Sequence, residues 1–218
     1  MTTEIPLISE DPGAKSFYRA CGYADAAHRG QVDKAGEPYF FHVFRVGASL
    51  VPDWSAARVG VLHDVLEDCP QIRPVELRSL LAGNGEMQAL LLLSRGKFQT
   101  YDEYIRRLAD VPLARKVKLA DLADTMRPER MAAAERAGHN MSRLVYRYGK
   151  AQHWLRKAEA GLPFGPRPGC GDCDDWYGCT MNCGEAPARC GRMGKREGEA
   201  HRRRAQPTAR VKGSSSGR

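Results

Sequence analysis

Hydrophobic residues recur along most of the chain at intervals of three and four positions. This spacing places them on one face of an α-helix, whereas a strand buried on one face would show strict alternation. Seven stretches have the helical spacing: residues 17–27, 40–50, 56–66, 87–93, 101–108, 113–126 and 141–155. Because no stretch alternates convincingly, the pattern predicts an all-α fold built from about seven short helices.

Glycines and prolines separate these stretches, and the character of the chain changes after residue 160. From Gly161 the sequence reads PFGPRPGCGDCDDWYGC, in which turn-forming residues recur every few positions. Further on it becomes basic and ends in serine and glycine. We therefore predict a lead-in at 1–14, a helical domain at 15–160, a cysteine-rich segment at 161–192 and a basic tail at 193–218, the last two largely irregular.

The net charge of +8 belongs to the end of the chain. Residues 189–218 hold ten Lys or Arg and two Glu, which leaves 24 basic and 24 acidic side chains in residues 1–188. The helical part is therefore neutral and offers no general attraction for nucleic acid. The basic tail is either a solvated segment or a surface that contacts RNA or a protein partner.

The sequence contains no signal for a membrane. No window approaches the eighteen or so consecutive apolar residues that a membrane-spanning helix needs. The first residues, MTTEIPLISEDPG, lack the basic and apolar regions of a signal peptide. We expect a cytoplasmic protein without a membrane partner.

The seven cysteines are distributed unevenly. Cys21 and Cys69 stand alone in the helical part, and five cysteines crowd into residues 170–190. This distribution is not typical of a disulfide framework. Four thiolates in a short segment are a candidate Zn²⁺ site, and the alternative is a redox-sensitive tail. The candidate zinc ligands are Cys170, Cys173, Cys179 and Cys183.

The stretch VLHDVLED concentrates four ionisable side chains in an apolar context. On a helix His63 would lie beside Glu67, and Asp64 beside Asp68, because residues four apart share a face. Burying so many ionisable groups is costly unless they share a cation or face a solvated cleft. The stretch therefore predicts part of a metal site.

Further ligands must come from other helices, and His42 in PYFFHVFRV and Asp121 in VKLADLAD are the candidates. Both stand among apolar residues, as an inward-pointing ligand would. Imidazole nitrogens and carboxylate oxygens without a thiolate suit Mn²⁺, with Fe²⁺, Zn²⁺ and Mg²⁺ as alternatives. Open coordination positions would accept water and a phosphate oxygen.

Three blocks of the sequence resemble a known family. AAHRGQVDKAGEPYFFHVFRV, VGVLHDVLED and ARKVKLADLADTM are similar to the hydrolase half of RelA/SpoT proteins, and closer still to stand-alone small alarmone hydrolases. The resemblance covers about residues 15–155 and implies a helical bundle of the HD type. It implies that His42, His63, Asp64 and Asp121 bind Mn²⁺, and that Glu67 and Asp68 position and activate the attacking water.

The implied substrate is guanosine tetra- or pentaphosphate, (p)ppGpp, whose 3′-pyrophosphate is removed to leave GDP or GTP. Alarmone clearance in the stringent response would be the cellular consequence. Too few residues follow 160 for a synthetase half, so we expect degradation only. Phosphoester hydrolysis also needs cationic or polar side chains that bind the negatively charged nucleotide. The candidates for substrate binding are Lys34, Lys97, Lys118 and Thr125.

The chain departs from the family at three positions. Asp33 stands where an arginine is common, Thr125 where the family has asparagine, and Val43 where proline follows the histidine. These departures leave open a phosphohydrolase that acts on a different nucleotide. A non-catalytic scaffold, whose tail binds RNA or a partner, is the other alternative. Tyr101 and Tyr104 either line a nucleotide pocket or pack within the core.

Overall fold

The computed structural model describes residues 11–162, and all of its regular secondary structure is helical. The helices are α1 (Pro12–Ala27), α2 (Phe40–Ala48), α3 (Trp54–Leu62), α4 (Val65–Asp68), α5 (Asn84–Leu93), α6 (Tyr101–Ala109), α7 (Pro112–Thr125), α8 (Pro128–Arg136) and α9 (Ser142–Glu159), with a 3₁₀ helix, η1 (Pro74–Leu80). Within these residues the predicted all-α fold is confirmed. The predicted division into domains stays a prediction, although α1 begins at Pro12, inside the predicted lead-in.

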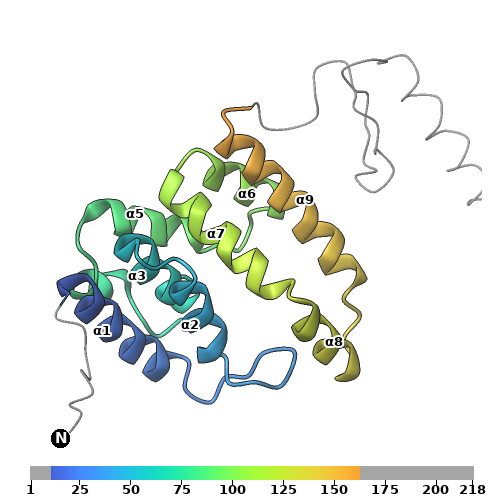
Figure 1. Ribbon diagram of the computed structural model, residues 1–218, viewed down its shortest axis with the longest axis horizontal. Helices are drawn as coiled ribbons and strands as arrows, with labels where there is room; N and C mark the ends of the chain where they lie inside the picture. The colour runs from blue at the N-terminus through green and yellow to red at the C-terminus, as the bar shows by residue number, and fades with distance from the viewer. Residues whose placement is uncertain (1–10, 163–218) are drawn as a thin grey trace, which may run out of the picture. The chain divides into compact units, whose positions relative to one another are not determined.

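Helix α7 runs through the middle of the described part, between α1 to α3 on one side and α6 and α9 on the other (Figure 1). It packs against α2, α3, α5, α6 and α9. Its buried apolar residues, among them Val117 and Leu122, join the core formed by Leu62, Leu90 and Leu108. Asp121 therefore lies on a helix that is packed on several sides, which fixes its position.

Helices α2 and α3 approach so closely that their backbones touch. A Cβ atom added to Gly60 of α3 would lie 3.1 Å from the Cα atom of Gly47 of α2. A Cβ atom on Gly47 would in turn lie 2.9 Å from the carbonyl oxygen of Ala57. The two glycines thus allow the contact that brings the end of α3 beside His42 of α2.

The helix expected through residues 56–66 is interrupted, so that expectation was wrong. Helix α3 ends at Leu62, His63 and Asp64 form a turn, and α4 begins at Val65. Nδ1 of His63 lies 2.7 Å from the Gly60 carbonyl oxygen. In a continuous helix that oxygen would accept from the Asp64 amide. The histidine ring therefore occupies the place where the helix breaks.

Two helical segments were missing from the expected set. The 3₁₀ helix η1 and helix α8 both begin at a proline, η1 is only seven residues long, and α8 contains one large apolar residue, Met131. A proline in the first helical turn loses no hydrogen bond, so it marks a start without a hydrophobic pattern. Helix α8 matters for function, because it supplies an arginine to the site.

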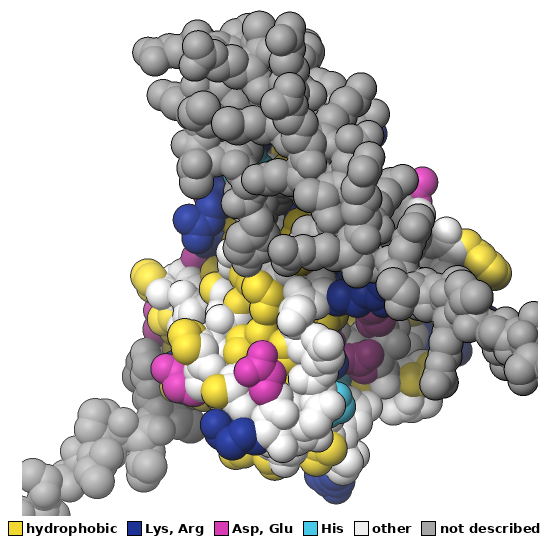
Figure 2. All heavy atoms as spheres, turned by 90° about the vertical axis from the view of Figure 1, so that its right-hand side faces the viewer, with side chains coloured by type: hydrophobic (Ala, Val, Ile, Leu, Met, Phe, Trp, Pro, Cys, Tyr) yellow, Lys and Arg dark blue, Asp and Glu magenta, His cyan; other side chains and the backbone are white. Residues whose placement is uncertain are grey.

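The face on the right-hand side of Figure 1 carries acidic and basic side chains next to one another, mixed with hydrophobic ones (Figure 2). Within residues 11–162, no helix combines the length and apolar character that crossing a bilayer requires.

Candidate metal centre

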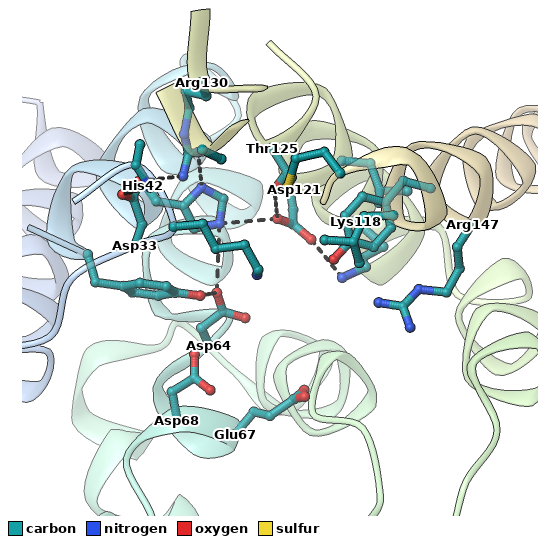
Figure 3. A pocket seen from close by; sticks show the side chains of 18 of the residues that line it. Asp33, His42, Asp64, Glu67, Asp68, Lys118, Asp121, Thr125, Arg130 and Arg147 are labelled. Atoms are coloured by element: carbon teal, nitrogen blue, oxygen red, sulfur yellow. Dashed lines mark hydrogen bonds and ion pairs between the residues drawn. The ribbon is translucent and has the colours of Figure 1, made fainter. Parts of the chain in front are cut away.

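Two histidines and two aspartates from separate helical segments meet at one point, and Figure 3 shows three of them, His42, Asp64 and Asp121. Nε2 of His42, on α2, is 3.1 Å from Oδ1 of Asp121, on α7, and 3.7 Å from Oδ2 of Asp64. Nε2 of His63 is 3.0 Å from the same Asp64 oxygen and 3.7 Å from the same Asp121 oxygen. The structure thus brings together all four residues predicted as metal ligands.

The other nitrogen of each imidazole is held from behind. Nδ1 of His63 faces the Gly60 carbonyl oxygen, and Nδ1 of His42 lies 2.8 Å from Oδ2 of Asp124. Because these oxygens only accept, we assign the proton of each neutral ring to Nδ1. Each Nε2 lone pair then points at the aspartates. Such an arrangement orients histidines for metal binding.

The donor set fits a cation. Lone pairs and carboxylates at these separations repel one another unless positive charge lies between them. Within residues 11–162, Nε2 of His63 is buried and makes no hydrogen bond of suitable geometry, although Oδ2 of Asp64 lies 3.0 Å away. Ligand atoms of His42, His63 and Asp64 all lie within 4.8 Å of one another, as binding to one ion requires. Burial lowers the pKa of His63, yet Asp64 and Asp121 outweigh it and raise the pKa to about 10. The two carboxylates thus attract positive charge to this point, which a proton on Nε2 supplies when no ion is bound and a metal ion supplies when the ring is neutral.

The cluster forms one wall of a cavity of about 300 Å³. This volume lies at the lower end of the range for small-molecule sites, roughly 300–1,000 Å³. The cavity is also lined by cationic side chains from several elements, namely Lys34, Arg95, Lys118, Arg130 and Arg147. A metal site on one wall and cations around it suit a ligand that carries several negative charges.

Glu67 and Asp68, predicted to act on water, line the same cavity beside Asp64 (Figure 3). Oε2 of Glu67 accepts a hydrogen bond of 3.0 Å from the backbone N–H of Arg95. Desolvation raises the pKa of Asp68, and the Asp64 carboxylate raises it further. A carboxylate with a raised pKa is the stronger proton acceptor.

No protein-family model matches the chain. A guanosine-3′,5′-bis(diphosphate) 3′-pyrophosphohydrolase of Borreliella burgdorferi is 42% identical over 57 residues, which cover 25% of this chain and 8% of that protein. The enzyme of the same name from Vibrio cholerae is 31% identical over 117 residues, covering 52% of this chain and 16% of that protein. Over these segments the chain is similar to two enzymes named as guanosine-3′,5′-bis(diphosphate) 3′-pyrophosphohydrolases.

Two further proteins are similar to parts of the chain. A GTP pyrophosphokinase of Streptomyces coelicolor is 29% identical over 155 residues, covering 65% of this chain and 18% of that protein. The chain thus spans less than a fifth of the length of these three curated relatives. A solved structure described as a metazoan orthologue of SpoT that hydrolyses ppGpp is 22% identical, with a TM-score of 0.45, covering 68% of this chain and 97% of that one.

The residues that we predicted to bind substrate differ in their positions relative to the cavity. Lys34, Lys118 and Thr125 line the cavity, whereas Lys97 is exposed and is not among the lining residues. Nζ of Lys118 lies 2.6 Å from Oδ2 of Asp121, and Oγ1 of Thr125 lies 3.3 Å from Oδ1 of the same residue. Both side chains thus touch a candidate metal ligand.

Three residues that surround the candidate ligands were not predicted from the sequence. Asp124 holds His42, and Arg130 of α8 contacts Asp124 while its Nη1 lies 2.9 Å from Nδ1 of His42. The Tyr39 hydroxyl donates a hydrogen bond of 2.6 Å to Oδ2 of Asp64. Asp124 follows Asp121 by three residues, and Tyr39 precedes His42 by three. This spacing was the signal in the sequence that each lies near a candidate ligand. The candidate zinc ligands lie outside the described residues.

Proposed function

We propose that residues 15–160 form a metal-dependent phosphohydrolase that removes the 3′-pyrophosphate of (p)ppGpp, giving GDP or GTP and pyrophosphate. The observation that supports this most strongly is the convergence of two imidazole Nε2 atoms and two carboxylates on a cavity that also contains Glu67 and Asp68. The names of two curated relatives point to the same reaction.

The proposed ion is Mn²⁺, held by His42, His63, Asp64 and Asp121. Two nitrogen and two oxygen ligands without a thiolate favour a borderline cation over a soft one. When bound, the ion would polarise the phosphoryl group and offset the negative charge that develops during the reaction. Lys118 adds a second positive charge next to Asp121.

The protein's own groups would manage the water and its proton. In the proposed reaction, water attacks the phosphorus attached to the 3′ oxygen, and the bond from phosphorus to that oxygen breaks. Asp68, whose pKa is raised, would accept the proton of the water. Glu67, fixed by the Arg95 amide, would orient the water through its second oxygen. The 3′ oxygen leaves as a hydroxyl after it gains a proton.

A different nucleotide is the second candidate substrate, and the pairing of Asp33 favours it. Where the resemblance leads us to expect an arginine, Oδ2 of Asp33 lies 2.7 Å from Nη2 of Arg130. The cavity wall at this position is thus an ion pair rather than a lone cation. An ion pair presents both donors and acceptors, which changes the recognition of a base.

The deciding experiment is hydrolysis of ppGpp by the purified full chain with Mn²⁺ or a chelator, together with a panel of other 3′- and 5′-phosphorylated nucleotides. We expect GDP and pyrophosphate as products with Mn²⁺, and no product with the chelator or with Asp64→Ala. Exposed Asp25, on α1 and outside the cavity lining, gives the matched control Asp25→Asn, which should retain activity. If only another nucleotide is hydrolysed, that nucleotide is the substrate in place of ppGpp. Hydrolysis by Asp64→Ala would indicate a contaminating enzyme.

A further inference from the structure

The five cations that line the cavity differ in how their charge is compensated. Lys118 pairs with Asp121, and Arg130 pairs with both Asp33 and Asp124. Lys34 and Arg95 are exposed to solvent. Arg147 is half-buried, and no carboxylate within residues 11–162 forms an ion pair with it.

Arg147 is held by aromatic rings instead of by acids. Its guanidinium carbon lies 4.6 Å from the centre of the Tyr101 ring and 5.3 Å from the centre of the Tyr148 ring. Stacking of this kind fixes the guanidinium plane but leaves its N–H groups free to donate. In Figure 3 the side chain enters the cavity from the side away from His42.

Two polar atoms of Arg147 and Tyr101 make no hydrogen bond within the described part of the chain. Within the described residues, Nε of Arg147 and the hydroxyl of Tyr101 are buried and make no hydrogen bond. Buried donors without a partner cost free energy, and such groups in a cavity mark a place where a ligand can supply the missing acceptor. Both groups donate, and one of them is positively charged, so the acceptor that fits best is an anion.

Building on the proposed function, we infer that Arg147 and Tyr101 bind the 5′-diphosphate of the nucleotide while its 3′-pyrophosphate lies at the metal centre. The two anionic groups would then occupy separate parts of the cavity. Apolar side chains that also line it, Leu122, Ala134, Met141 and Leu144, offer a surface for the nucleoside. The site would thereby select nucleotides that are phosphorylated at both the 3′ and the 5′ position.

The first test measures binding and does not depend on hydrolysis. GDP carries the 5′-diphosphate and guanosine does not, so the full chain should bind GDP more tightly than guanosine. Charge-assisted hydrogen bonds correspond to a difference of about 10- to 100-fold in Kd. Arg147→Gln should abolish most of this difference, and Arg147→Lys should retain part of it. Arg143→Gln is the matched control, because Arg143 is exposed on the same helix and does not line the cavity.

The second test separates this inference from the proposed reaction. With ppGpp and a guanosine that carries only the 3′-diphosphate, Arg147→Gln should raise KM about 10- to 100-fold for ppGpp alone. The inference would be overturned if Arg147→Gln raised KM equally for the two substrates, or weakened the binding of GDP and of guanosine equally. The proposed reaction would be unaffected by either result. If ppGpp is not hydrolysed but Arg147→Gln removes the preference for GDP, the 5′-diphosphate site stands and the proposed reaction fails. Equal binding of GDP and guanosine by the unaltered chain overturns the inference.

Discussion

Asp33 and Arg130, 97 positions apart in the sequence, form an ion pair of 2.7 Å at the cavity. Asp33 belongs to the segment between α1 and α2, and its Oδ1 accepts hydrogen bonds from the backbone N–H groups of Ala35 and Glu37. Arg130 also contacts Asp124, which holds His42. One guanidinium therefore connects α8 with a loop and with a candidate metal ligand.

This connection predicts that Arg130→Gln weakens metal binding although Arg130 is not a ligand. Without the guanidinium, Asp124 and the ring of His42 lose part of their support. Changes to groups that hold a metal ligand typically cost about 10- to 100-fold in metal affinity or activity. Calorimetric titration with Mn²⁺ measures the affinity. Arg136→Gln, an exposed arginine on the same helix, should leave it unchanged.

The exchange Asp33→Arg with Arg130→Asp tests the pair itself. If attraction between the two side chains matters, the double variant should bind Mn²⁺ better than Asp33→Arg alone, because that single change places two arginines together. Equal losses in the double and single variants would show that Arg130 acts through Asp124 and not through Asp33.

The close contact of α2 and α3 at Gly60 predicts that a larger residue at this position lowers the free energy of unfolding. In Gly60→Ala the new Cβ atom would lie 3.0 Å from Cδ1 of Leu50 and 3.1 Å from the Cα atom of Gly47, so the helices must separate. Overpacking of this kind costs about 1–3 kcal/mol. Gly22→Ala on α1 is the control: nothing lies within 4 Å of its Cβ position, and alanine favours helix by about 1 kcal/mol. In urea unfolding, Gly60→Ala should lower the free energy of unfolding and Gly22→Ala should raise it. An unchanged free energy of unfolding in Gly60→Ala would contradict the close contact of the two helices.

The candidate ligands could be predicted because each stands within a recognisable local pattern. His63 and Asp64 are adjacent among apolar residues, and His42 and Asp121 have similar surroundings. Asp124 and Arg130 could not be predicted in this way, since charges in DTMRPER are typical of a solvated surface. Their role depends on Asp33 and His42, which only the tertiary fold brings near.

The break between α3 and α4 was missed for a related reason. Apolar periodicity continues through residues 56–66, and nothing in that pattern reveals a ring that bonds to the Gly60 carbonyl. Helix α8 was missed because only Met131 among its residues is a large apolar side chain. Hydrophobic periodicity therefore identified most of the helices that build the core, and left out the short η1 and the helix attached by ion pairs.

The buried pair of Arg58 and Glu86 predicts a pH-dependent contribution to stability. Nη2 of Arg58 lies 2.5 Å from Oε1 of Glu86, which also accepts from the Ser55 hydroxyl at 2.6 Å. Burial raises the pKa of Glu86, but these hydrogen bonds outweigh it, and the folded-state pKa lies below the ordinary 4.5. Glu86→Gln leaves the guanidinium without its counter-ion, which costs about 3 kcal/mol at pH 7.

The lowered pKa of Glu86 sets the direction in which stability changes with pH. A lowered folded-state pKa stabilises the protein fully above the unfolded-state value and progressively less as the pH falls through the folded-state value. The difference in unfolding free energy between the unaltered protein and Glu86→Gln should therefore be constant near pH 7 and shrink below about pH 4.5. Urea unfolding between pH 7 and pH 3.5 measures it. A difference that stays constant down to pH 3.5 would show that the charge of Glu86 is unimportant.

Metal removal should lower the thermal stability of the protein, because a ligand that binds only the folded state stabilises it. At a free Mn²⁺ concentration of 100 times Kd, the gain is about 2.7 kcal/mol, which corresponds to a Tm increase of several degrees for a domain of this size. Asp64→Ala removes one candidate ligand and one negative charge, so Mn²⁺ should hardly change its Tm. The readout is the shift on adding Mn²⁺ or chelator, not the starting Tm, since Asp64→Ala also relieves repulsion between carboxylates. An equal shift in both proteins would mean that the ion binds elsewhere, and Asp25→Asn should reproduce the shift of the unaltered chain.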